Sequence, residues 1–173
     1  MPNALELPAP LRISLGYALP AQRDAWRCLF LLDLRLGSLV IHSREPMLAQ
    51  IRLAWWRDAL ALPPLMRPVG DPLLAQIGQH LAGIESELSA LATAWEALIG
   101  DAPLPQERLM EYCSLRASAY AAMARITGTP ECRERAMAHA RHWVIGDTQS
   151  RLCDPQERAA VNTFPLVNAN PYP

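Results

Sequence analysis

Large apolar residues recur between positions 74 and 98 at alternating steps of three and four. They are Leu74, Ile77, Leu81, Ile84, Leu88, Leu91, Trp95 and Leu98. This spacing puts every member on one face of an α-helix, whereas a strand would need a period of two. The pattern therefore predicts one unbroken helix of about seven turns. Such a seam packs either within the chain or between two copies as a coiled coil, and the other apolar helices of this chain favour the first.

Helical spacing also appears in the rest of the chain, and no stretch shows the alternation of a strand. The predicted helices cover residues 11–19, 21–40, 46–62, 105–126 and 131–152. Proline and glycine separate the last four from their neighbours, because proline lacks the amide donor and restricts the residue before it. We therefore predict an all-α fold, built as a helical bundle.

The helix that starts at Pro46 carries apolar residues on more than one side. Pro46 fits the first turn of a helix, where its missing N–H breaks no hydrogen bond. One apolar stripe contains Leu48, Ile51, Trp55, Ala59 and Leu62, and Met47, Leu53 and Trp56 lie on other sides. A helix with so much apolar surface is expected inside the bundle.

Length and composition fit one domain, since the chain has 173 residues and a hydrophobic fraction of 51%. Three proline residues within positions 1–10 predict an extended N-terminal arm. The helical domain is expected over residues 11–155. Asparagine and proline become frequent near the end, which predicts an irregular tail over residues 156–173.

Charge and cysteine content indicate which partners and which cellular compartment to expect. The net charge of −1 gives no broad attraction to nucleic acid, so no nucleic-acid partner is expected. The four cysteines are far apart, and the N-terminus does not resemble a signal peptide, which fits a cytoplasmic protein. Charged residues interrupt every apolar run, so peripheral association, at the inner membrane for example, is the most membrane contact that we expect.

Arginine residues provide the candidate binding groups. Arg116 interrupts the apolar stripe of its helix one turn after Tyr112. It either pairs with a buried carboxylate, such as Asp33 or Asp58, or presents its charge to an anionic ligand. Arg52 and Arg57 flank the tryptophan pair. They either bind a phosphate or lipid head group or extend charged ends into solvent from apolar stems.

Several motifs occur here in a characteristic order. They are LFLLDLRL at 29–36, EPMLAQIRLAWWRDAL at 45–60, Tyr112-Cys113 and AAMARITG at 121–128. Together they resemble the squalene/phytoene synthase family. The resemblance implies the N-terminal half of an isoprenoid synthase fold. Enzymes of that family join two prenyl diphosphates head to head, with Mg²⁺ held between two aspartate-rich motifs.

The aspartates of those motifs are missing here. Alignment on the resemblance puts the first motif at Gly37 and Ile41, and the second at Arg151 and Pro155. The pattern is closer to a divergent branch of the family that includes a mitochondrial assembly factor for respiratory complex I and bacterial relatives. We therefore expect a non-catalytic protein without a cofactor, which either binds an isoprenoid or other lipid or acts as an assembly or scaffold factor for a protein partner. The resemblance and the residue pattern together give the ligand-binding candidates Asp33, Arg52, Tyr112 and Arg116.

Two alternatives remain open at this point. The first is an active prenyl diphosphate transferase in which Asp33, Asp147 and Asp154 hold Mg²⁺ in place of the usual acids. The second is an inactive truncated product whose unusual tail replaces the second half of the domain.

Overall fold

The computed structural model describes residues 7–43, 45–128 and 132–165. Within these ranges the chain forms α-helices, two short 3₁₀ turns and no strand, which confirms the all-α prediction. The helices are α1 (Ala9–Tyr17), α2 (Arg23–Ile41), α3 (Pro46–Ala61), α4 (Pro72–His80), α5 (Glu85–Glu96), α6 (Gln106–Ile126), α7 (Arg133–Arg151) and α8 (Pro155–Asn162). None of these helices is both long enough and apolar enough to cross a bilayer.

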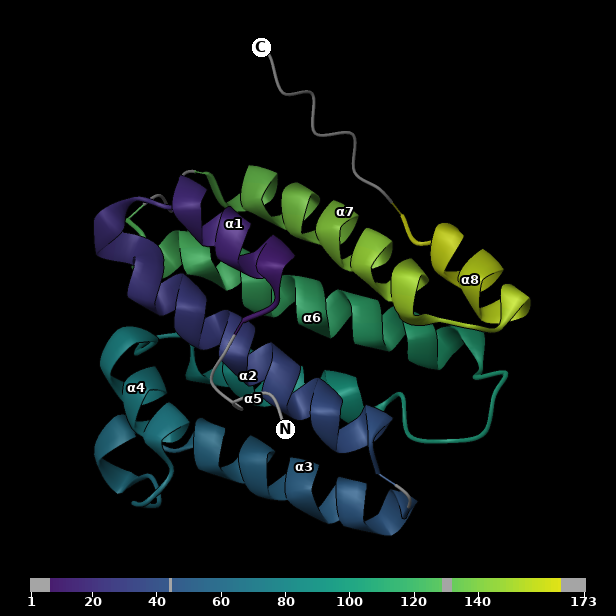
Figure 1. Ribbon diagram of the computed structural model, residues 1–173, viewed down its shortest axis with the longest axis horizontal. Coiled ribbons are helices and arrows are strands. Elements are labelled where there is room, and N and C mark those ends of the chain that lie inside the picture. The colour runs from purple at the N-terminus through teal and green to yellow at the C-terminus, as the bar shows by residue number, and fades with distance from the viewer. Residues whose placement is uncertain (1–6, 44, 129–131, 166–173) are drawn as a thin grey trace.

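The helices pack as a layered bundle around α5 and α6. Figure 1 shows α3 and α7 on opposite sides, with α2, α5 and α6 between them. The most extensive contacts join α3 to α5, α5 to α6 and α6 to α7. The first helix packs on α2, and α8 lies against α6 and α7. The centre of the bundle is therefore formed by helices that are covered on more than one side.

The prediction of one helix over residues 74–98 is wrong, although its apolar face is buried as expected. The chain forms α4 and α5 instead, and Gly83 between them has a φ of +93° that only glycine adopts easily. Glu85 supports the break, because both of its carboxylate oxygens accept from the Gly83 N–H at 3.0 Å. The apolar residues from Leu74 to Trp95 are still buried in the core. Their spacing of three and four therefore reflects burial of both helices, α4 before the bend and α5 after it.

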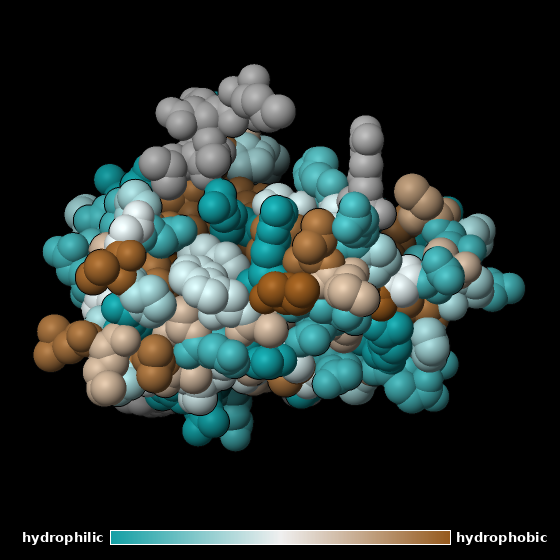
Figure 2. Space-filling view, turned by 90° about the horizontal axis from the view of Figure 1, so that it is seen from below, coloured by the Kyte–Doolittle hydropathy of each residue, from teal (hydrophilic) through white to brown (hydrophobic). Residues whose placement is uncertain are grey.

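The position of α3 differs from the prediction that it lies inside the bundle. It begins at Pro46 as expected, but it lies at the edge and buries the face that includes Leu53 and Trp56. The predicted stripe points mostly outward, since Ile51 is 59% exposed and Trp55 is 43% exposed. Figure 2, which views the molecule from the side of α3, shows hydrophobic side chains among polar ones on this surface. Helical spacing could not decide which of two apolar faces packs on α5.

Both ends of the described chain are more helical than predicted. Residues 1–6 of the expected N-terminal arm lie outside the described ranges, but Ala9 and Pro10 already belong to α1. The expected irregular tail begins with α8, whose N-terminus is capped by Asp154 through the N–H groups of Gln156 and Glu157. An aspartate followed by proline is a helix-start signal, and it decides the structure here. Residues 166–173 lie outside the described ranges.

Candidate functional site

Asp33 is the centre of a buried polar cluster between α2, α5 and α6. Its side chain enters the core from α2 and is surrounded by donors. Trp95 donates its indole N–H to Oδ1, and the hydroxyl of Tyr120 donates to Oδ2, each at 2.8 Å. Arg116 adds three contacts, of which the shortest joins Nη2 to Oδ2 at 2.6 Å. The charge of Asp33 is therefore matched by a cation and by two neutral donors.

Arg116 links this carboxylate to a second one on α7. Its side chain is 1% exposed, and Nη1 lies 2.7 Å from Oδ2 of Asp147, in an ion pair that is not aligned as a hydrogen bond. Arg151 approaches Asp147 from one turn away, with Nε 2.8 Å from Oδ2. Alternating charges therefore connect α2, α6 and α7.

Aromatic rings enclose the guanidinium of Arg116. Its central carbon lies 4.8 Å from the ring centre of Trp143, 5.4 Å from that of Trp95 and 5.5 Å from that of Tyr112. These distances suit cation–π attraction, which strengthens where water is excluded. The arrangement confirms the structural alternative for Arg116, a pairing with Asp33 in the core.

Three groups of this cluster, Arg116, Asp147 and Tyr120, have shifted pKa values. Burial alone would lower the pKa of Arg116, but the adjacent Asp33 carboxylate raises it well above its ordinary value. Burial would likewise raise the pKa of Asp147, yet the hydrogen bond from Arg151 and the charge of Arg116 bring it below its ordinary value. Burial and the nearby Asp33 raise the pKa of Tyr120 well above its ordinary value. The shifts of Arg116 and Asp147 therefore both favour the charged form near neutral pH.

Tyr112 lies beside this network without joining it by a hydrogen bond. Its ring packs edge-on against Trp95, with ring centres 5.1 Å apart. Its hydroxyl is buried and has no hydrogen-bond partner among the described residues. Burial raises the pKa of Tyr112, so the hydroxyl stays protonated. The structure thus brings Asp33, Tyr112 and Arg116 together, as one packed group.

At Gly37, the first of the two positions aligned with the family's first aspartate motif, the core leaves no room for a side chain. A Cβ atom on Gly37 would lie 2.8 Å from Cη2 of Trp95, so the indole ring fills the space that a side chain would need. Ile41 is the last residue of α2 and is 57% exposed. Among the residues that the structure describes, no three His, Cys, Asp or Glu side chains come together as metal ligands.

The acids left over for the alternative catalytic hypothesis all have other partners. Asp33 and Asp147 pair with Arg116, and Asp154 caps α8. At the aligned positions of the second motif, Arg151 pairs with Asp147 and Pro155 opens α8.

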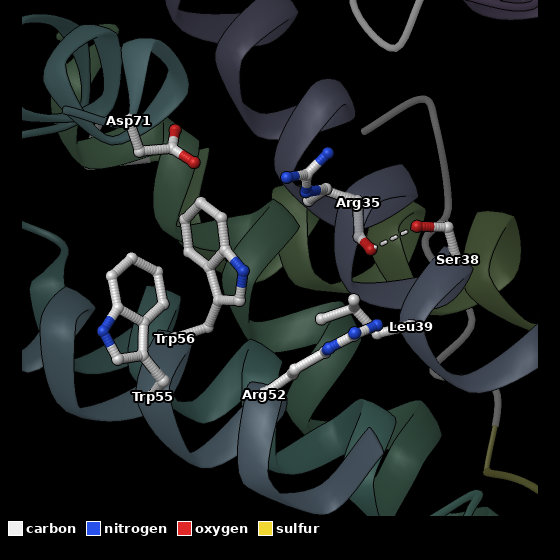
Figure 3. A pocket seen from close by; sticks show the side chains of 7 residues that line it. All are labelled: Arg35, Ser38, Leu39, Arg52, Trp55, Trp56 and Asp71. Atoms are coloured by element: carbon white, nitrogen blue, oxygen red, sulfur yellow. Dashed lines mark hydrogen bonds between the residues drawn. The ribbon is translucent and has the colours of Figure 1, made fainter. Parts of the chain in front are cut away.

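Arg52 is separate from the other three candidates. It lines a pocket of about 410 Å³ between α2, α3 and the start of α4, together with Arg35 and both tryptophans of α3 (Figure 3). The four ligand-binding candidates therefore belong to two places, a packed cluster in the core and a pocket at the surface.

An apolar cavity of about 370 Å³ was missed by the sequence analysis. It lies between α1, α2, α6 and α7, and its lining residues are Ser14, Trp26, Phe30, Tyr120, Met123, Ala124, Thr127, Cys132, Ala136, His139, Ala140 and Trp143. Tyr120 forms part of its wall and also donates to Asp33. An adjoining cavity of about 270 Å³ shares Ser14, Trp26 and Phe30. Trp26 and Phe30 stand one turn apart in the sequence, but only packing shows that they face a space between helices.

Comparison with known proteins adds no neighbour to this description: no family model, no curated protein and no solved structure matches the chain. The resemblance to the squalene/phytoene synthases therefore rests on the sequence motifs alone.

Proposed function

We propose that this protein is a non-catalytic relative of the squalene/phytoene synthases that binds one isoprenoid-like lipid chain. The proposed binding site is the apolar cavity between α1, α2, α6 and α7. That cavity is the observation that carries the proposal, because its lining is mainly aromatic and aliphatic and its volume lies in the range of small-molecule sites.

The lining suits a branched, unsaturated hydrocarbon chain. Tyr120 and Trp143 have ring centres 4.3 Å apart, and Trp26 and Phe30 form a second aromatic pair at 5.8 Å. Met123 also lines the cavity. The aromatic rings and the thioether are polarisable and can adapt to a hydrocarbon chain of irregular shape. Burial of the chain's apolar surface supplies the driving force, about 25 cal/mol per Å² removed from water.

The absence of catalysis is proposed from the state of the acids. A diphosphate site needs free carboxylate oxygens for Mg²⁺, and those of Asp33 and Asp147 already accept from arginines. The ring of Trp95 fills the space beside Gly37. Under this proposal the protein holds a lipid chain and leaves its bonds unchanged.

The test is titration with farnesol, a neutral isoprenoid alcohol. Farnesol has no phosphate group, so it offers no anion to Arg52 in the surface pocket. Trp26 and Trp143 line the cavity, so farnesol should change tryptophan fluorescence in a saturable way. Ala136→Phe places a ring in the cavity and should weaken binding at least about tenfold. Ala75→Phe on the exposed face of α4 is the matched control and should bind as the native protein does. Without saturable binding, or with equal loss in both variants, the proposal fails and the scaffold role predicted from the sequence becomes the better alternative.

A further inference from the structure

A second pocket, on the side of the molecule formed by α2 and α3, is lined by two cations. Arg35 comes from α2 and Arg52 from α3, and both line the cavity of about 410 Å³. Neither guanidinium has an ion pair or hydrogen bond among the described residues. Figure 3 shows Arg35 on the side toward Asp71 and Arg52 beside Leu39. The pocket thus contains donors that no described residue uses.

The tryptophans of α3 make one wall of this pocket. Trp56 is 4% exposed and held in place by the core, and Trp55 packs edge-on against it with ring centres 5.3 Å apart. The indole N–H of Trp56 has no partner among the described residues, and Figure 3 shows it on the side of the ring toward the two arginines. The wall therefore offers a rigid apolar surface and one more donor.

One carboxylate also lines the pocket. Oδ1 of Asp71 accepts from the N–H groups of Leu73 and Leu74 at 2.9 and 3.1 Å, so its charge faces the positive end of α4. Ser38 donates its hydroxyl to the carbonyl of Arg35 at 2.7 Å. The pocket is therefore positive on balance, because its two cations have no partner in the described part of the chain and its one carboxylate is engaged at a helix end.

We propose that this pocket binds a phosphate ester. The phosphate would accept from Arg35 and Arg52, whose guanidinium groups match a tetrahedral oxyanion with paired N–H donors. The organic part of the ester would lie on the ring of Trp55 or Trp56, beside Leu39. The volume of the pocket exceeds that of a phosphate alone, which is why the proposal includes an organic part. No residue of this pocket lines the cavity proposed for the lipid chain. The failure of one proposal therefore leaves the other unaffected.

Isothermal titration of the full chain with phenyl phosphate tests this proposal. The native protein should bind one equivalent, and the double variant Arg35→Gln/Arg52→Gln should lose at least about tenfold in affinity, because two charge-assisted contacts disappear. The control double variant Arg135→Gln/Arg158→Gln removes the same charge from exposed positions on α7 and α8 and should bind as the native protein does. Equal loss in both double variants, or no binding by the native protein, would overturn the proposal.

Two further probes identify the source of the phosphate. Inorganic phosphate should bind more weakly than phenyl phosphate, and equal affinities would overturn the role of the tryptophan wall. Vesicles of phosphatidylcholine with and without phosphatidic acid test a lipid head group. Sedimentation that depends on phosphatidic acid and on both arginines would assign the pocket to a lipid phosphate, whereas phenyl phosphate binding without sedimentation would assign it to a soluble ester.

Discussion

Arg116 and the pair formed by Arg35 and Arg52 lie beside tryptophan rings, yet their surroundings differ in one decisive respect. Arg116 is enclosed in the core, where two carboxylates use its charge. Arg35 and Arg52 line a surface pocket in which no described residue uses theirs. A charge whose partners are all internal contributes to the fold, whereas a charge without an internal partner is available to a ligand.

Removal of Arg116 should produce the largest loss of stability. In Arg116→Met the carboxylate of Asp33 stays buried without its cation, which should lower the free energy of unfolding by about 3–5 kcal/mol. Urea denaturation measures this change, and Arg135→Met at the surface of α7 is the control.

The same cluster allows a sharper version of this test. Asp33→Asn/Arg116→Met removes both charges and keeps an amide oxygen that can accept from Trp95 or Tyr120, so it should be more stable than Arg116→Met alone. If the double variant were the less stable of the two, the unpaired carboxylate would not explain the loss.

A methyl group at Gly37 should have the next largest effect. The Cβ of Gly37→Ala would lie 2.8 Å from the ring of Trp95, and overpacking of this kind costs about 1–3 kcal/mol. Gly146→Ala in α7 is the matched control, because no atom lies within 4 Å of its added Cβ, and it should gain up to about 1 kcal/mol. Thermal unfolding followed by circular dichroism compares the two variants, and equal melting temperatures would contradict close packing at Gly37.

Acid should weaken the network through Asp147. Its pKa is lower in the folded protein than in the unfolded chain, so its contribution to stability is complete above the unfolded value of about 4. That contribution is lost as the pH falls through the folded value. Asp147→Asn should therefore show a flatter decline of unfolding free energy below about pH 4 than the native protein. Asp101→Asn, in the exposed turn before α6, should keep the native slope, and a native slope in Asp147→Asn would contradict this role.

Removal of Arg35 and Arg52 should have the smallest effect on stability. Both side chains are exposed and unpaired among the described residues, so Arg35→Gln/Arg52→Gln should change the free energy of unfolding by no more than about 0.5 kcal/mol. Urea denaturation in phosphate-free buffer measures this change. A loss comparable to that of Arg116→Met would show that the two environments do not differ as described.

The sequence predicted the elements of this fold better than their placement. Pro46 marked the start of α3, and the period of three and four identified the buried face of α4 and α5. The break at Gly83 was missed because an isolated glycine is tolerated in a helix, and only the folded chain shows its positive φ. The outward face of α3 was misjudged because both of its faces are apolar, and the choice between them depends on α5.

The candidate site was also predicted only in part, because the sequence pattern does not show how the helices are placed. The polar Arg116 on an apolar stripe indicated a buried partner, and Asp33 is that partner. Tyr112 was predicted because it lies one helical turn before Arg116, and in the structure it packs against Trp95 beside the cluster. Arg52 was proposed from its place beside the tryptophan pair, and both tryptophans do line its pocket, but its spacing along the chain could not show that Arg35 of α2 lies in the same pocket. The apolar cavity lies between α1, α2, α6 and α7, and no local sequence pattern predicted it.

The most direct measurement is isothermal titration of Arg35→Gln/Arg52→Gln, whose surface pocket has lost its two arginines, with farnesyl and geranylgeranyl diphosphate, each with and without Mg²⁺. The isoprenoid chain should enter the cavity and the acids of the core should stay paired with arginine, so binding should occur without Mg²⁺ and keep the same affinity when it is added. Binding that requires Mg²⁺, or no binding in either condition, would contradict the proposal of a non-catalytic isoprenoid-binding protein.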